Sequence, residues 1–79
     1  MGTRITYVIK FSKGVTMPDL ATSPIITQHL TIKLKNADGF VVDSNINDVK
    51  LRELIMATFN LEKKDVIVLS KFPGLMNTL

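Results

Sequence analysis

The stretch "LTIKLKNADGFVVD", Leu30–Asp43, decides the fold of this chain. Apolar and polar residues alternate in its first half, which is typical of a strand with one buried face. The residues "NADG", Asn36–Gly39, suit a type I turn followed by a glycine in the left-handed region. The stretch therefore predicts a β-hairpin. Its expected cross-strand pairs are Asn36 with Phe40, Leu34 with Val42 inside, and Lys33 with Asp43 outside as an ion pair.

The first strand of this hairpin begins two residues earlier, so that it covers 28–35. A further strand is expected at the N-terminus, over 4–12, because "RITYVIKFS" alternates in the same way. Its inward residues are Ile5, Tyr7, Ile9 and Phe11. Both segments thus predict half-buried strands.

After the hairpin the apolar period changes to that of a helix, predicted over 48–60 with its core stripe on Leu51, Leu54, Ile55, Phe59 and Thr58. Asn47 or Ser44 could cap it, and Asp48 suits the positive end of its dipole. The segment "VIVLSKF", 66–72, begins with the unbroken apolar run Val66–Leu69, which predicts an interior strand covered on both faces or partly covered by a partner. The tail "PGLMNTL" is too short to form an element, and either docks or frays.

The expected fold class is α+β, a four-stranded mainly antiparallel sheet with one packed helix in the order β-β-β-α-β. A chain of 79 residues has room for a single domain, 1–79. The block 30–72, which holds "LTIKLKNADGFVVD", "VKLRELIMATF" and "DVIVLS", resembles the core of the ubiquitin-like β-grasp. The N-terminal strand and its long loop depart from that pattern. The resemblance implies a binding surface more than a catalytic site.

Composition excludes several classes of protein. The chain has no cysteine, which excludes disulfides and thiolate metal sites and is compatible with the cytoplasm. Its sequence contains no apolar run long enough to cross a bilayer, so we expect a soluble protein that does not bind membranes.

Catalytic chemistry has little support in the sequence. The single histidine, His29, falls at an outward strand position, and the carboxylates suit turns and helix ends. Glycine-rich phosphate loops are also missing from the sequence. We therefore expect no enzymatic activity, no metal and no cofactor.

Positive charge is concentrated in the first part of the chain. Residues 1–35 carry five bases and one acid, whereas residues 36–79 carry five bases and six acids. If the first two strands are neighbours, one sheet face collects Arg4, Lys10, Lys33 and Lys35. Such a patch could contact phosphates, although lysines at these positions also protect a sheet edge from self-pairing.

The loop "GVTMPDLATSPIITQ", Gly14–Gln28, is unusually long for so small a domain. Thr16 is expected to cap a helical turn over about 17–21, and "SPII" is expected to return the chain in an extended form. Four apolar residues of the loop either close the chain's own core or bind a partner: Met17, Leu20, Ile25 and Ile26.

These features predict a small non-enzymatic protein-interaction or regulatory module that either forms a homo-oligomer or docks on a larger protein. The loop, whose one charged residue is Asp19, and the apolar last strand motivate this hypothesis, because together they offer more apolar surface than one helix covers. The alternative hypothesis is a nucleic-acid-binding protein that uses the basic sheet face.

Overall fold

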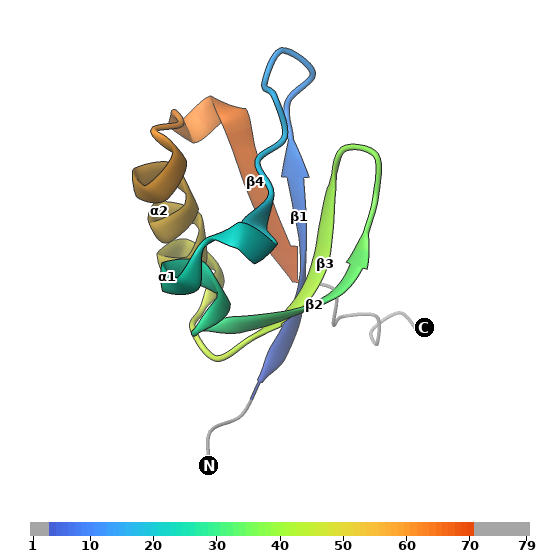
Figure 1. Cartoon of the computed structure of the whole chain (residues 1–79), viewed down its shortest axis with the longest axis vertical. Coiled ribbons are helices and arrows are strands. Elements are labelled where there is room, and N and C mark those ends of the chain that lie inside the picture. The colour runs from blue at the N-terminus through green and yellow to red at the C-terminus, as the bar shows by residue number, and fades with distance from the viewer. Residues whose placement is uncertain (1–3, 71–79) are drawn as a thin grey trace.

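The computed structural model describes residues 4–70, which form one antiparallel sheet with helices on one side (Figure 1). The strands are β1 (Ile5–Phe11), β2 (Leu30–Lys35), β3 (Gly39–Ser44) and β4 (Val66–Ser70). The α-helices are α1 (Pro24–Thr27) and α2 (Asp48–Phe59), and the 3-10 turns are η1 (Leu20–Thr22) and η2 (Lys63–Asp65). The α+β class, the four strands and the packed main helix are as the sequence predicts. The tail Pro73–Leu79 lies outside the described residues.

The strand order across the sheet is β2-β3-β1-β4. The first two strands are therefore not neighbours, since β3 lies between them. The last strand is not an interior strand either: within residues 4–70, β4 pairs only with β1 and forms one edge of the sheet. The order of elements along 30–70 follows the β-grasp-like expectation, but β1 is inserted between the hairpin and β4.

The core lies between the sheet and the helices. The helix-facing side chains of the two central strands are buried, among them Ile9 of β1 and Phe40 of β3. Leu51 and Ile55 of α2 are fully buried against them, as the predicted helical stripe requires. Asn47 caps α2, because its Oδ1 accepts the backbone N–H of Lys50 at 2.8 Å. Ser44, the alternative cap, instead bonds through its hydroxyl to the backbone of Ile46.

The hairpin differs from its predicted register by one residue. A bulge between Ile32 and Leu34 leaves Lys33 without a residue opposite it in the backbone register of β3. Leu34 then pairs with Val41 instead of Val42. A shift of one residue turns a side chain to the other face of a sheet. Leu34 is accordingly 56% exposed and lies on the face opposite the helices.

Gly39 also has a different role from the predicted one. Neither glycine within residues 4–70 has a positive φ, so Gly39 is not a left-handed turn residue. It begins β3 opposite Lys10, and a Cβ there would lie 1.8 Å from the carbonyl oxygen of Ile9. The close approach of β1 to β3 therefore requires a glycine at this position.

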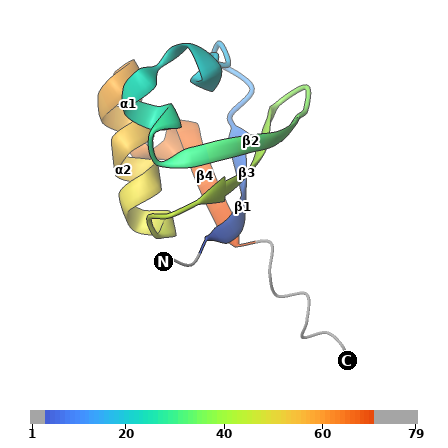
Figure 2. The same cartoon turned by 60° about the horizontal axis from the view of Figure 1, so that its bottom comes forward.

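The long loop is ordered by two short helical turns instead of one. Asp19, and not Thr16, caps η1, because its carboxylate accepts the backbone N–H of Ala21 at 3.1 Å. The segment "SPII" is helical rather than extended, since Pro24 occupies the first turn of α1, where its fixed φ favours a helix start. Both turns lie on the helix side of the sheet, where α1 packs against α2 and η1 packs against α1 (Figure 2).

Candidate interaction surface

The loop residues predicted to bind a partner are divided by the structure. Leu20 and Ile26 are fully buried in the chain's own core, and Met17 is partly buried against it. These residues close one end of the core, so Leu20 and Ile26 are not accessible to a partner in this conformation. Ile25 alone is well exposed, at 54%. It lies on α1, and therefore not on the strands of the open side of the sheet (Figure 1).

The predicted basic patch is also divided. Lys35 pairs with Phe40, whose ring lies in the core, so Lys35 belongs to the helix side of the sheet. The bulge at Lys33 causes this, because it shifts every later residue of β2 by one position. Lys33 does form the predicted ion pair with Asp43, with Nζ 3.7 Å from Oδ2. The four basic residues therefore do not share one face of the sheet, because Lys35 lies on the helix side.

The opposite sheet face carries an apolar row that the sequence did not reveal. Cross-strand neighbours share a face, and Val8 of β1 lies opposite both Val41 of β3 and Leu69 of β4. Leu34 of β2 extends the row beyond Val41, so that it crosses all four strands. Ile67 lies two residues before Leu69 and points to the same side.

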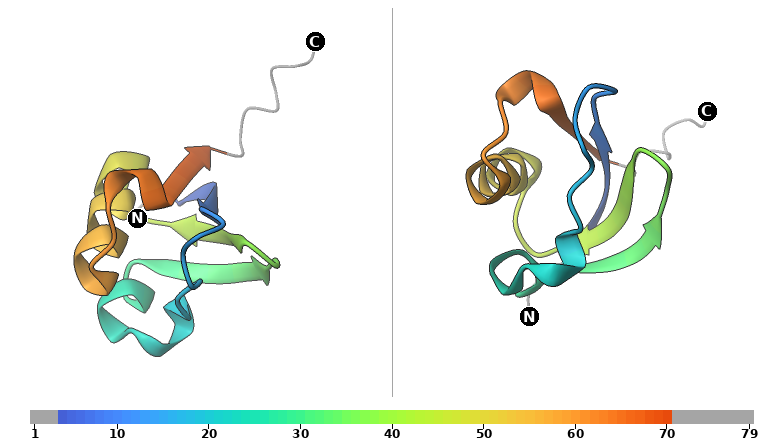
Figure 3. Two further views of the ribbon diagram at one scale, coloured as in Figure 1. Left: turned by 90° about the horizontal axis from the view of Figure 1, so that it is seen from above. Right: turned by 45° about the horizontal axis from the view of Figure 1, so that its top comes forward.

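We call this surface the open face, and its apolar residues are Val8, Leu34, Val41, Ile67 and Leu69. Within residues 4–70, no helix or strand covers the open face (Figure 3). Leu34, Ile67 and Leu69 are 56%, 46% and 51% exposed, respectively. The sequence held a signal for β4, because alternate residues of a strand lie on opposite faces and the unbroken run "VIVL" must therefore place two of its residues on the face away from the core.

Polar groups border the row on both sides. On one side Thr6 donates to the carboxylate of Asp43 at 2.7 Å, and Arg4 donates to the hydroxyl of Thr31 at 2.9 Å. On the other side lies Lys10, opposite Gly39 and Ile67. An apolar centre with a polar rim is the usual anatomy of a protein–protein interface.

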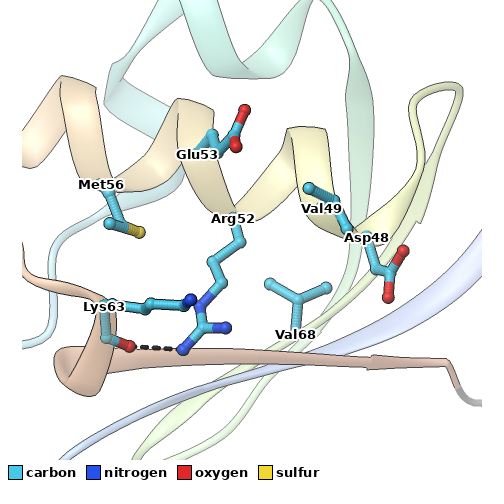
Figure 4. Close-up of a pocket in the computed structure, with 7 residues that line it drawn as sticks. All are labelled: Asp48, Val49, Arg52, Glu53, Met56, Lys63 and Val68. Atoms are coloured by element: carbon cyan, nitrogen blue, oxygen red, sulfur yellow. Dashed lines mark hydrogen bonds between the residues drawn. The ribbon is translucent and has the colours of Figure 1, made fainter.

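A cleft of about 310 Å³ lies between α2 and β4 (Figure 4). Arg52 crosses it from α2, and its Nε donates to the backbone carbonyl of Val66 at 2.9 Å. A second guanidinium nitrogen of Arg52 donates to the carbonyl of Lys63 in η2. The rest of the lining comprises Asp48, Val49, Glu53, Met56 and Val68. Arg52 therefore fixes the start of β4 to the helix. The sequence did not indicate this role, because Arg52 stands among other charged residues of the helix, Lys50 and Glu53.

The described residues offer few groups with altered chemistry. Burial raises the pKa of the Tyr7 hydroxyl above its usual value, and the nearby charge of Asp48 raises it further. Among residues 4–70, no cluster of three or more histidine, aspartate or glutamate side chains could hold a metal ion. Over the same range, every helix is too short or too polar to span a bilayer.

Comparison of the chain with protein-family models, with curated proteins and with solved structures finds no match. The functional argument therefore rests on the surfaces described above.

Proposed function

We propose that this chain is a small non-enzymatic protein-interaction module whose contact surface is the open face. The observation that supports the proposal is the apolar row that crosses all four strands, Leu34–Val41–Val8–Leu69. Burial of aliphatic side chains in an interface contributes roughly 25 cal/mol of favourable free energy for each Å² of apolar surface removed from water. Contiguous apolar patches on soluble domains usually mark binding sites. A partner with an apolar surface of its own fits this row best.

The alternative is nucleic-acid binding through the basic residues of the same face. Arg4 and Lys10 favour it, because Lys10 projects from β1 beside the row and Arg4, which precedes β1, donates to Thr31 on the same face. Two features weaken it: Lys33 is paired with Asp43, and the row offers aliphatic side chains where base stacking requires aromatic ones. We therefore rank it second.

The test compares three single lysine substitutions at residues of nearly equal exposure: Leu34→Lys, Leu69→Lys and Ile25→Lys. The first two place a charge on the open face, whereas Ile25 lies on α1 and is the matched control. Tagged protein expressed in its natural host is used to capture partners, and circular dichroism confirms that each variant folds. We expect the same partner proteins to be lost with both open-face variants and retained with Ile25→Lys.

Binding of DNA and RNA is measured in parallel at low and moderate salt. Retention of one partner set by all three variants would contradict the proposal. Binding of nucleic acid with a steep salt dependence, lost in Lys10→Glu and retained in Leu34→Lys, would support the alternative.

A further inference from the structure

The outer edge of β4 exposes backbone groups in a defined pattern. The N–H of Ser12 donates to the carbonyl of Asp65 at 3.0 Å, which sets the alternation of hydrogen bonds between β1 and β4. In an antiparallel pair, residues that bond to the neighbouring strand alternate with residues whose backbone groups point away from it. The backbone groups of Val66 and Val68 therefore point outward from the sheet. Arg52 agrees with this assignment, because it reaches the Val66 carbonyl from outside the sheet.

The side chains of β4 do nothing to prevent another strand from pairing there. The strand "VIVLS" contains no charged residue and no proline, and its register with β1 is continuous from Val66 to Ser70. Natural sheet edges are commonly protected by lysine, proline or a bulge. Ile67 and Leu69 also remain about half exposed on the open face, beside this edge.

The cleft between α2 and β4 carries a negative charge at one end and a positive charge at the other. Asp48 lies near the end where β4 finishes, and Lys63 lies near the end where β4 begins (Figure 4). A two-fold axis through the middle of β4 would reverse one copy relative to the other. Asp48 of each copy would then lie toward Lys63 of the other, which makes the surface complementary to itself in charge.

We propose that two copies of this chain associate by antiparallel pairing of β4 with β4, centred on Val68, to form a continuous eight-stranded sheet. In this arrangement Val68 pairs with Val68 of the second copy, and Ile67 lies opposite Leu69 of the second copy. The open-face rows of the two copies become one row. This inference rests on the proposed function, of which it names one partner.

The experiment measures the mass of the full-length chain in solution by light scattering and sedimentation over a range of concentrations. We expect twice the chain mass of 8.8 kDa. Ile67→Lys should raise the dimer Kd by roughly tenfold or more, because it places a lysine opposite the apolar Leu69 of the second copy. Leu34→Lys, on the far strand β2, is the matched control and should remain dimeric.

A charge-reversal series tests the geometry of the pairing. Lys63→Glu should weaken the dimer at low salt, and the double variant Asp48→Lys with Lys63→Glu should restore it, because the two ends exchange charges. Thermal unfolding of each variant confirms that the fold is retained.

A wild-type chain that stays monomeric, or a dimer lost in Leu34→Lys and kept in Ile67→Lys, would overturn the β4 pairing. Failure of the double variant to recover would also count against it. A monomeric wild type that still captures partners through the open face would refute this inference and leave the proposed function standing. If the wild type is a dimer and no open-face variant changes the captured partners, the proposed function is refuted and the β4 pairing stands.

Discussion

The two edge strands of the sheet differ in how well they resist pairing with another strand. The β2 edge carries Lys33 and Lys35, and its register is broken by a bulge. The residues of β4 include no charge and no bulge, and Arg52 of α2 donates to the outward carbonyl of Val66. Lysines and bulges are the features by which natural sheets discourage edge-to-edge association. Association at one edge only gives a closed dimer, whereas two unprotected edges would give an open chain of copies.

This difference also explains why the open face is not a uniform surface. At the β2 end its apolar residue, Leu34, lies beside the ion pair of Lys33 with Asp43. At the β4 end Ile67 and Leu69 lie together with no charged residue on their strand. We infer that the β4 end is suited to a second copy and the rest of the row to a different protein.

The largest expected effect comes from Gly39→Ala, which disrupts the pairing of β3 with β1 in the middle of the sheet, between the two edge strands. A Cβ at this position would lie 1.8 Å from the Ile9 carbonyl oxygen, so β3 must move away from β1 and carry β2 with it. We expect the free energy of unfolding in urea to fall by at least about 3 kcal/mol. Gly14→Ala is the control, because nothing lies within 4 Å of its added Cβ. Equal midpoints for the two variants would show that the strands are not so close.

Removing the protection of the β2 edge should have the next largest effect. In the double variant Lys33→Thr and Lys35→Thr, both edges lack charge, so dimers can join further through β2. We expect the mass measured by light scattering to rise beyond the dimer with increasing concentration. Lys13→Thr with Lys64→Thr is the control, since it changes the net charge equally and leaves β2 intact. If both double variants have the same mass, the lysines of β2 do not limit association.

The sequence predicted local elements well because they depend on local periodicity. The strands, the helix from Asp48 and its Asn47 cap all follow from residues close together in the chain. The strand order did not follow, because β1 inserts between β3 and β4, far from both in sequence. A turn signal such as "NADG" locates a hairpin, but the bulge at Lys33 sets its register. That single residue decides the face on which Leu34 and Lys35 lie.

The candidate surface was less predictable for the same reason. The sequence identified Leu20 and Ile26 as notable, but whether such residues face a core or a partner depends on tertiary packing. For the apolar run of β4 it left two alternatives, an interior strand or a strand partly covered by a partner, and the edge position of β4 rules out the first. Of the two alternatives for the loop, the core holds for Leu20 and Ile26, whereas Ile25 remains exposed. The excess apolar surface of β4 lies on the open face, at Ile67 and Leu69.

The smallest effect concerns how firmly the β4 edge is held in place. Arg52 donates to the Val66 carbonyl at 2.9 Å and to the Lys63 carbonyl, which ties η2 and the start of β4 to α2. Arg52→Met keeps an unbranched apolar stem and removes both hydrogen bonds. We expect a loss of about 1 to 2 kcal/mol in the free energy of unfolding, because charged donors to backbone carbonyls contribute more than neutral ones.

Hydrogen exchange separates this local effect from a general loss of stability. The amides of Ile67 and Leu69 bond to β1, so they should exchange faster in Arg52→Met, while the β2 amides that bond to β3 should change only as global stability does. Lys50→Met is the control, because it removes a positive charge from an exposed position of the same helix. Unchanged exchange in β4 would mean that pairing with β1 alone positions the edge.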